Sequence, residues 1–423
     1  MASISVVIPA YNEESGIAEI VERVLNVQSK LAEVGVSGFE LIVVDDGSRD
    51  KTAQITRKIA ESNPALRLIS HPVNKGYGAA LKTGFGCAEG DLIGFLDADG
   101  TYPPEYFPQL CQAALNGADL VIGSRMAGED SQMPMTRRAG NLFFANLLSI
   151  VGRQRVSDSA SGMRVFKKEI LERIYPLPDG LNLTPVMSTR AVHENVKMTE
   201  VPIPYSERVG RSKLSVTQDG TLFLHSMLWT ALSYNPVRLL GILGLAGIGL
   251  ALICGLGLFI ARARGVQTLE PWNVVALYIS AISGVIGISL FALGAMFNYL
   301  VSLFHRSPVR QGLFGRPIFK TPVEYYFGWI GLFALLVGLG IGLVSLYLGL
   351  HGWDMNRLWL YGLASAMSIL VGVQLIIYWV IIKTLEEVSQ REVKIASEMQ
   401  LVESDEPVAW SGNIPSELTA MEQ

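Results

Sequence analysis

The sequence is poor in cysteine and in charged residues, and each shortage excludes a class of protein. Its three cysteines, Cys87, Cys111 and Cys254, are too few and too irregularly spaced for a disulfide framework or a zinc site, which indicates a reducing compartment. The 34 Lys and Arg residues nearly balance 38 Asp and Glu residues, so no basic excess favours nucleic acid as a partner. The first residues lack a charged leader before an apolar core, and we therefore expect no secretory signal.

The charged residues are concentrated in one half of the chain. They make up only 17% of the 423 residues, and the mean hydropathy is +0.34. Nearly all long apolar runs lie beyond Pro236, whereas residues 1–235 have the composition of a globular protein. A chain of this length allows two or three domains. We predict a globular N-terminal half and a membrane-spanning C-terminal half.

In the N-terminal half, short β-branched runs alternate with segments in which apolar residues recur at helical spacing. Helices are predicted at residues 17–34, 51–62 and 79–88 and after Pro103. Strands are predicted at residues 4–8, 39–44, 66–70, 92–96 and 119–123. Alternation of strands and helices at this spacing predicts a mostly parallel sheet with helices on both faces.

Polar residues follow three of the predicted strands: Tyr11-Asn12-Glu13, Asp45-Asp46-Gly47 and Asp97-Ala98-Asp99. The carboxyl ends of parallel strands share one edge of the sheet, where ligands bind in such folds. Two carboxylates as close as Asp97 and Asp99 repel each other unless a cation lies beside them. Magnesium-type sites often use one or two carboxylates and leave the remaining positions to substrate phosphates. The pattern favours a divalent cation that holds a diphosphate, and a solvated acidic turn is the alternative.

Five segments in this half resemble glycosyltransferase family 2: VVIPAYNEE, VVDDGSRDKT, NKGYGAALKTG, DADGTYPPE and IGSR. The likeness is strongest to polyprenyl-phosphate glycosyltransferases of the dolichol-phosphate mannose synthase type, and it covers about the first 125 residues. It implies an α/β nucleotide-sugar-binding (GT-A) domain with a Rossmann-like, mostly parallel sheet. The apolar runs beyond this domain predict an all-α transmembrane domain of four helices.

The resemblance also implies roles for single residues. Asp45 would accept hydrogen bonds from the nucleobase, and the remaining donor-binding residues would be Pro9, Tyr11, Glu13, Lys75, Gly76 and Asp97. Asp97 and Asp99 would bind Mg2+ or Mn2+, which stabilises charge on the leaving nucleotide. For Gly76, simple turn geometry remains an alternative. Relatives often carry Gln where this chain has Thr101, which leaves the metal preference open.

A second group of residues resembles the acceptor side of the same enzymes. Residues 158–164 (DSASGMR) are similar to a segment whose acid faces the reactive sugar carbon, which implies catalytic roles for Asp158 and Arg125. Whether Asp158 acts as a base or only orients its partners stays open. Residues 207–214 (ERVGRSKL) resemble a stretch that precedes the membrane in polyprenyl-phosphate enzymes. Arginine binds phosphate bidentately and lysine adds a point charge. The predicted acceptor-phosphate site comprises Arg125, Arg138, Arg208, Arg211, Ser212 and Lys213. For Arg208, Arg211 and Lys213, the alternative to a specific phosphate site is attraction to anionic lipid headgroups.

The C-terminal half contains four uncharged stretches long enough to cross a bilayer. We predict a GT-A domain at 1–214, an interfacial amphipathic helix at 215–236, a transmembrane domain at 237–383 and a polar, frayed tail at 384–423. The spans are predicted at about 239–260, 274–304, 327–350 and 358–382. The most basic loop, His305–Tyr326, and the basic start of the tail indicate that the catalytic domain and the tail are cytoplasmic. Gly338 and Gly342 form a GxxxG pair that favours close helix packing.

These observations favour a multi-pass membrane enzyme. It would transfer one hexose, with inversion, from a GDP- or UDP-sugar to a dolichyl or undecaprenyl phosphate. Transfer to another lipid such as diacylglycerol is one alternative. A membrane scaffold or glycolipid-moving protein with a regulatory nucleotide-sugar-binding module is the other. The sugar, the nucleobase and homo-oligomer formation stay open.

Overall fold

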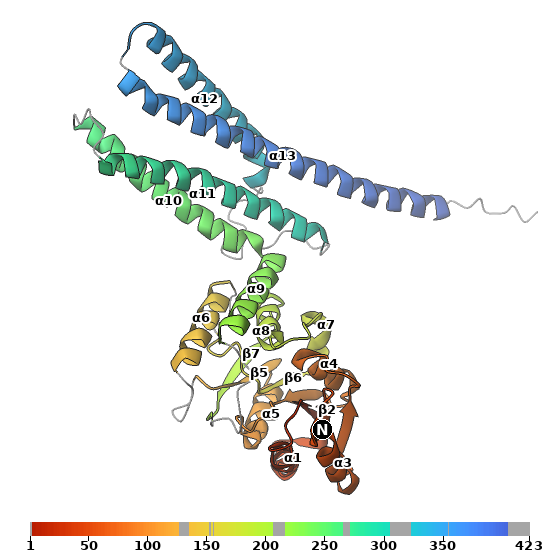
Figure 1. Cartoon of the computed structure of the whole chain (residues 1–423). Helices are drawn as coiled ribbons and strands as arrows, with labels where there is room; N and C mark the ends of the chain where they lie inside the picture. Colours follow the sequence, from red (N-terminus) through yellow and green to blue (C-terminus); the bar gives the residue numbers. More distant parts are fainter. Residues whose placement is uncertain are drawn as a thin grey trace, which may run out of the picture. The chain divides into compact units, whose positions relative to one another are not determined.

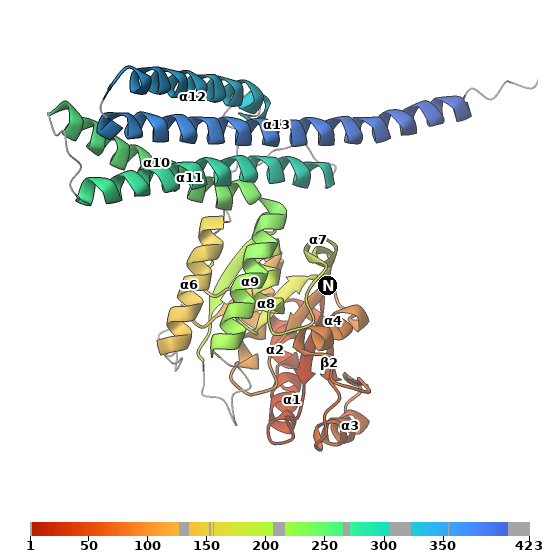
Figure 2. The same ribbon diagram turned by 45° about the horizontal axis from the view of Figure 1, so that its top comes forward.

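The computed structural model describes residues 2–126, 135–151, 154, 156–205, 216–264, 271–304, 323–353 and 355–404 (Figures 1 and 2). The chain divides into two compact units, Met1–Leu239 and Leu240–Gln423. The first unit carries the sheet and the second carries the long apolar helices.

A seven-stranded sheet forms the centre of the first unit, in the order β3-β2-β1-β4-β6-β5-β7. The strands are β1 (Ala2–Ala10), β2 (Val36–Asp45), β3 (Leu66–Ser70), β4 (Leu92–Phe95), β5 (Leu120–Ser124), β6 (Arg164–Lys167) and β7 (Met198–Pro202). The predicted mostly parallel sheet is confirmed, and β6 alone among these strands runs antiparallel, between β4 and β5. Ala10 pairs with Asp45 and Val7 with Phe95. The ends of β1, β2 and β4 therefore share one edge.

Helices cover both faces of this sheet. They are α1 (Ile17–Leu25), α2 (Gln28–Glu33), α3 (Thr52–Ser62), α4 (Tyr77–Cys87), α5 (Phe107–Leu115), α6 (Met135–Val151), α7 (Leu171–Ile174), α8 (Leu183–His193) and α9 (Val216–Tyr234), with short 3-10 turns at Pro104–Tyr106 and Lys168–Ile170. Successive strand residues face opposite sides, so Val6 packs in the core with α1 and α5 while Val7 packs in the core with α4 and α8.

The single helix predicted at 17–34 is wrong, because the chain turns between α1 and α2. The Val27 N–H donates to the Val24 carbonyl at 3.2 Å, and the Leu31 N–H then donates to the Val27 carbonyl at 3.0 Å. This tighter turn re-aims the second helix, and Val24, Val27 and Leu31 all remain buried in the core. Continuous apolar spacing hides such a break from sequence reasoning.

The second unit consists of α-helices, whose first member begins just before the boundary. They are α10 (Pro236–Ala263), α11 (Pro271–Phe304), α12 (Phe327–Leu350) and α13 (Met355–Ser404), with a 3-10 turn at Val323–Tyr326. All four α-helices are long and apolar enough to cross a membrane. Against expectation, α13 continues to Ser404 instead of ending in a frayed tail after residue 383. Residues 384–404 contain neither Gly nor Pro, so nothing in the sequence breaks the helix.

Close backbone contacts join α12 to α13. The predicted GxxxG pair faces Ser365 of α13, whose hydroxyl donates to the Gly338 carbonyl at 2.7 Å. A Cβ added to Gly342 would lie 2.7 Å from the same hydroxyl. A polar contact also joins α13 to α11, because the Gln374 amide donates to the Ser289 hydroxyl at 2.7 Å. Small residues and polar contacts therefore hold the second unit together, as in membrane helix bundles.

Candidate active site

The loops that follow β1 and β2 form one wall at the carboxyl edge of the sheet. The Asn12 N–H donates to Ser48 Oγ at 2.9 Å, and the Arg49 N–H donates back to Asn12 Oδ1 at 2.8 Å. The Glu13 N–H donates to Thr52 Oγ1 at 2.9 Å. These bonds fix the backbone that carries the predicted donor-binding residues Tyr11 and Glu13.

Two adjacent acids lie at the end of β2, Asp45 as its last residue and Asp46 directly after it, and sequence reasoning singled out only the first. Asp45 is buried and accepts a hydrogen bond from the Ser48 N–H at 3.3 Å. Asp46 is also buried, and its carboxylate accepts from the N–H groups of Lys75 and Gly76 at 2.9 and 2.8 Å. His71 Nδ1 lies 2.7 Å from the same carboxylate. Asp46 therefore shapes the loop that leads into α4.

The glycines of that loop make room for the chain's own backbone. Gly76 has φ +104°, and a Cβ there would lie 2.6 Å from the Asp179 carbonyl oxygen. A Cβ on Gly78 would meet the Pro178 carbonyl. The Ala79 N–H also donates to the Asp179 carbonyl at 3.1 Å. This packing favours the structural interpretation of Gly76, whereas the neighbouring Lys75 side chain is exposed.

Asp97 and Asp99 follow β4, and a hydroxyl group holds each carboxylate. Tyr77 donates to Asp97 Oδ1 at 2.7 Å. Thr101 donates to Asp99 Oδ1 through its hydroxyl at 2.6 Å and its N–H at 3.2 Å. On the other side of Asp97 lies Gly162, where an added Cβ would lie 2.7 Å from Asp97 Cγ.

The donor set of this pair fits a hard divalent cation. Within the described ranges, no group of three or more His, Cys, Asp or Glu side chains is arranged to hold a metal ion. Asp97 and Asp99 therefore offer two carboxylates, and the remaining positions around an ion would go to water or substrate oxygens. This arrangement is typical of Mg2+ and Mn2+ sites rather than of structural zinc sites.

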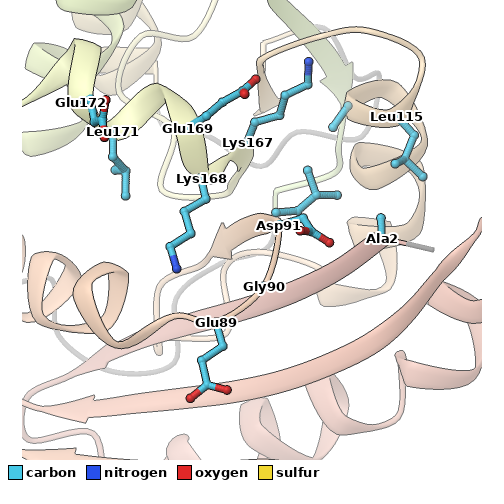
Figure 3. A pocket seen from close by; sticks show the side chains of 12 residues that line it. Ala2, Glu89, Gly90, Asp91, Leu115, Lys167, Lys168, Glu169, Leu171 and Glu172 are labelled. Carbon is cyan, nitrogen blue, oxygen red and sulfur yellow. The ribbon is translucent and has the colours of Figure 1, made fainter.

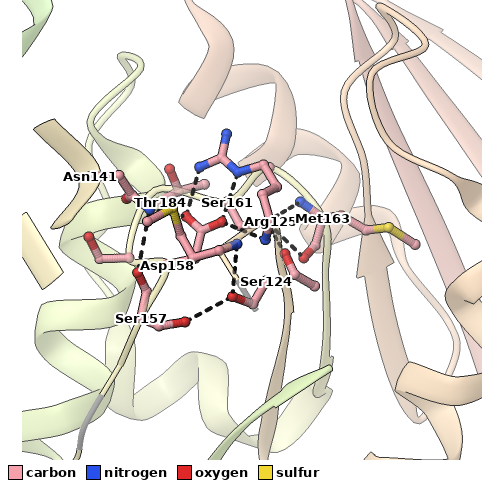
Figure 4. Close-up of polar contacts among 12 residues, drawn as sticks. Ser124, Arg125, Asn141, Ser157, Asp158, Ser161, Met163 and Thr184 are labelled. Atoms are coloured by element: carbon pink, nitrogen blue, oxygen red, sulfur yellow. Dashed lines mark hydrogen bonds and ion pairs between the residues drawn. The ribbon is translucent and has the colours of Figure 1, made fainter. Parts of the chain in front are cut away.

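Both carboxylate oxygens of Asp158 accept two hydrogen bonds each, from Arg125 and Asn141 (Figure 4). Its carboxylate accepts from Arg125 Nε at 2.8 Å, Arg125 Nη2 at 2.7 Å and the Arg125 N–H at 3.0 Å. Asn141 Nδ2 adds a bond at 3.0 Å. Burial alone would raise the pKa of Asp158, but the guanidinium charge and these hydrogen bonds lower it overall. A buried, ionised and fully bonded carboxylate orients Arg125 and is poorly suited to act as a base.

Two tyrosine rings also lie against Arg125. Its guanidinium carbon lies 5.7 Å from the ring centre of Tyr102 and 5.5 Å from that of Tyr205. Tyr102 also accepts a hydrogen bond from the Gly162 N–H at 2.7 Å. The ring contacts and the Asp158 pair leave Arg125 little freedom, as an anion-binding arginine requires.

Arg164 lies beneath this site with no exposed surface. It donates to the carbonyls of Ser159 and Ser161 at 2.7 and 3.0 Å and to the Ser188 hydroxyl at 2.9 Å. Burial lowers the pKa of Arg164 to about 10, so it stays charged at neutral pH. Sequence reasoning assigned this arginine no role, yet it fixes the turn between Asp158 and Gly162.

Of the other predicted acceptor residues, the structure describes only Arg138. Arg138 lies exposed on α6. Arg208, Arg211, Ser212 and Lys213 lie outside the described residues, within 206–215. That segment begins after Tyr205, whose ring packs on Arg125.

Apolar side chains on α6 are a feature that sequence reasoning did not interpret. Helices α6 and α9 lie side by side (Figures 1 and 2), with the rings of Phe144 and Phe223 6.1 Å apart. Phe143 on α6 is 55% exposed, and Trp229 on α9 is 61% exposed. Such large exposed apolar groups on neighbouring helices indicate an interaction surface.

A hollow of about 890 Å³ lies at the opposite edge of the sheet (Figure 3). It opens where β4 begins at Leu92, opposite Lys167 at the end of β6. Lys167 is paired with Asp119 at 2.8 Å, and Asp91 accepts from Ser3 at 2.9 Å. Because it lies at the start of β4, away from the Asp97 edge, we assign it no part of the site.

Known proteins match both halves of the chain. Residues 5–175 match the family model "Glycosyl transferase family 2", and residues 236–396 match one described as "Domain of unknown function (DUF8752)". The dolichyl-phosphate hexose transferase of Haloferax volcanii is 33% identical over 211 residues, which cover 50% of this chain and 86% of that protein. The chain belongs to glycosyltransferase family 2.

Further relatives of this family 2 glycosyltransferase include the low-salt glycan biosynthesis hexosyltransferase Agl6 of Haloferax volcanii. It is 34% identical over 263 residues, covering 61% of this chain and 59% of that protein. An undecaprenyl-phosphate 4-deoxy-4-formamido-L-arabinose transferase of Edwardsiella ictaluri is 30% identical over 57% of this chain and 71% of that protein. A glucosyl-3-phosphoglycerate synthase structure from Mycobacterium tuberculosis covers 54% of this chain and 80% of its own, with 23% identity and a TM-score of 0.41.

The Gly162 contact yields a test of the glycosyltransferase site. Gly162→Ala would place a methyl group 2.7 Å from Asp97 Cγ, closer than real contacts allow, and should displace the carboxylate. We expect the rate of sugar transfer to fall about a hundredfold, because a misplacement of about 1 Å in an active site can reduce the rate by that factor. The measurement is the initial rate of lipid-linked sugar formation.

The matched control for this substitution is Gly86→Ala in α4. A Cβ at Gly86 has no neighbour within 4 Å, so this change should keep the rate and add up to about 1 kcal/mol of stability. Normal activity in Gly162→Ala would show that Asp97 does not need its observed position.

Proposed function

We propose that this protein transfers a hexose from a GDP- or UDP-sugar to a polyprenyl phosphate, with inversion at the anomeric carbon. One observation carries the proposal: a single segment, residues 157–164, supports both halves of the site. Asp158 at its start binds Arg125, and Gly162 near its end packs against Asp97. The dolichyl-phosphate hexose transferase and undecaprenyl-phosphate formamido-arabinose transferase relatives support the same assignment.

On the donor side, Asp97 and Asp99 would hold Mg2+ or Mn2+ against the diphosphate. When bound, the ion supplies Lewis-acid stabilisation of the charge that develops on the leaving nucleotide. Asp45 would accept hydrogen bonds from the nucleobase. Pro9 near the end of β1, together with Tyr11 and Glu13 in the fixed wall after it, would line the base and ribose. Lys75, exposed on the loop that Asp46 shapes, can reach towards a phosphate.

On the acceptor side, Arg125 would bind the lipid phosphate. A phosphate monoester is already ionised near neutral pH, so it attacks without a general base. The occupied carboxylate of Asp158 agrees with this requirement, since it orients Arg125 and accepts no further proton from the acceptor. Arg138, Arg208, Arg211, Ser212 and Lys213 would add positive charge along the approach of the phosphate.

The lipid would reach Arg125 along the membrane surface. The helices α10 to α13 identify a membrane protein, and the loop charges favour a cytoplasmic catalytic domain and tail. We propose residues 1–214 as the catalytic domain, 215–236 as an interfacial helix and 237–383 as the transmembrane domain. The exposed Phe143 and Trp229 suit the boundary between headgroups and acyl chains.

A donor panel tests the proposal. The full chain in detergent is given UDP-glucose, UDP-galactose, GDP-mannose or GDP-glucose with undecaprenyl or dolichyl phosphate and Mn2+. We expect one donor to yield a lipid-linked sugar, and EDTA to abolish the product. Absence of lipid-linked product with every donor, while nucleotide-sugars still bind, would favour a regulatory binding module instead.

A further inference from the structure

The hydroxyl of Tyr77 donates to Asp97 from a position that the sequence does not connect with the acidic pair. Tyr77 is the first residue of α4, twenty positions before Asp97, and its Oη lies 2.7 Å from Asp97 Oδ1. We propose that Tyr77 is a positioning residue, which holds the Asp97 carboxylate in place for a divalent cation. The inference rests on the proposed metal-assisted transfer.

The backbone around Tyr77 is fixed from two directions. Before it, the N–H groups of Lys75 and Gly76 donate to the buried Asp46 carboxylate. After it, the Ala79 N–H donates to the Asp179 carbonyl at 3.1 Å. These contacts restrain the backbone at the start of α4. The Tyr77 hydroxyl is therefore held in a fixed position beside Asp97.

Asp97 is held between this hydroxyl and the Gly162 backbone. A Cβ added to Gly162 would lie 2.8 Å from Asp97 Oδ1 and 2.7 Å from Cγ, so the backbone already touches the carboxylate. The Gly162 N–H is bound in turn by Tyr102 Oη at 2.7 Å. A carboxylate restrained on both sides cannot rotate freely. Partners that orient a metal-binding carboxylate usually contribute about tenfold to a hundredfold in metal affinity.

Tyr77→Phe is the sharpest test because it removes only the hydroxyl. The full chain in detergent is titrated with Mn2+ in the presence of UDP or GDP, whichever binds more tightly, and free Mn2+ is read by electron paramagnetic resonance. We expect the Mn2+ dissociation constant to rise about tenfold. The control is Tyr106→Phe, the same change in a partly buried tyrosine of the same unit, which should leave the constant unchanged.

A double-substitution cycle separates positioning from a general loss of structure. If Tyr77 acts through Asp97, Tyr77→Phe should have less than a twofold effect on Mn2+ binding in an Asp97→Asn background. Wild-type Mn2+ affinity in Tyr77→Phe, or an equal loss in both backgrounds, would overturn the inference. Mn2+ binding that depends on Tyr77 in a chain that forms no lipid-linked product would refute the proposed transfer reaction alone.

Discussion

Replacing Asp99 by Asn should abolish sugar transfer and leave the fold intact. Asn has the shape of Asp, and the Thr101 hydroxyl that donates to Asp99 Oδ1 at 2.6 Å can still donate to an amide oxygen. What the variant loses is one of the two negative charges offered to the cation. Metal ions supply several kcal/mol of transition-state stabilisation, and about 4 kcal/mol corresponds to roughly a thousandfold in rate. We therefore expect the initial rate to fall about a thousandfold.

The matched control for this prediction is Asp91→Asn. Asp91 is an exposed carboxylate on the same unit that accepts from the Ser3 N–H and hydroxyl at 3.0 and 2.9 Å. It borders the hollow at the opposite edge of the sheet. Its substitution removes the same charge but should keep the rate within about twofold. Near-normal transfer by Asp99→Asn would refute the assignment of the acidic pair.

Asp158→Asn should destabilise the catalytic unit as well as inactivate it. Asp158 has 0% exposed side-chain surface and Arg125 has 12%, so the variant leaves a largely buried guanidinium without its counter-ion. Breaking one side of such a pair typically costs about 3–5 kcal/mol. We expect the melting temperature of the catalytic unit to fall by roughly 10 °C. The measurement is thermal unfolding of the full chain in detergent, followed by near-ultraviolet circular dichroism.

The pH dependence of this difference distinguishes an orienting carboxylate from a base. Because its partners lower the pKa of Asp158, the pair stabilises the fold above the unfolded pKa of about 3.9. That contribution is lost as the pH falls through the lower folded pKa. The stability gap between wild type and Asp158→Asn should stay constant from pH 8 to pH 5 and shrink only in stronger acid. A gap that changes between pH 5 and pH 8 would indicate a neutral-range pKa and a catalytic base.

An Arg125→Gln/Asp158→Asn double variant is the control for the buried charge. It removes the guanidinium together with its partner, so no unpaired charge remains in the site. It should be more stable than Asp158→Asn alone and equally inactive. A double variant less stable than the single one would show that the loss comes from packing.

The edge of the sheet was predictable because strand ends are visible in the sequence. Residues 41–44 and 92–96 are apolar runs, each followed by acids, and parallel strands bring such ends together. Strand β6 was not predictable, since Arg164–Lys167 has only four residues, with a charged residue at each end. Its antiparallel insertion depends on pairing with β4 and β5, which no local pattern encodes.

The contacts that hold the site were hidden from the sequence for a similar reason. Tyr77 belongs to a segment read as a glycine-rich turn, and its link to Asp97 exists only in three dimensions. For Gly76 the sequence allowed either a nucleotide contact or simple turn geometry, and the structure shows the Asp179 backbone packed against it. Asp158 was singled out by resemblance alone. Its burial and its pairing with Arg125 are what identify an orienting role.

In the C-terminal half, the sequence predicted the presence of the long apolar helices better than the positions of their ends. Long uncharged runs indicate spanning helices whatever their partners. Beyond the apolar run, the end of α13 depends on the helix propensity of polar residues. The helix continues through such residues to Ser404, and the length of the apolar run does not predict this continuation.

The central claim is that the acceptor is a lipid phosphate that attacks without a base. The most direct measurement gives the purified full chain a radiolabelled nucleotide-sugar, Mn2+, and either undecaprenyl phosphate or undecaprenol at equal concentration, and counts labelled lipid. The account predicts label on the phosphate lipid only, at a rate independent of pH between 6.5 and 8. Label on undecaprenol, with none on the phosphate lipid, would contradict it.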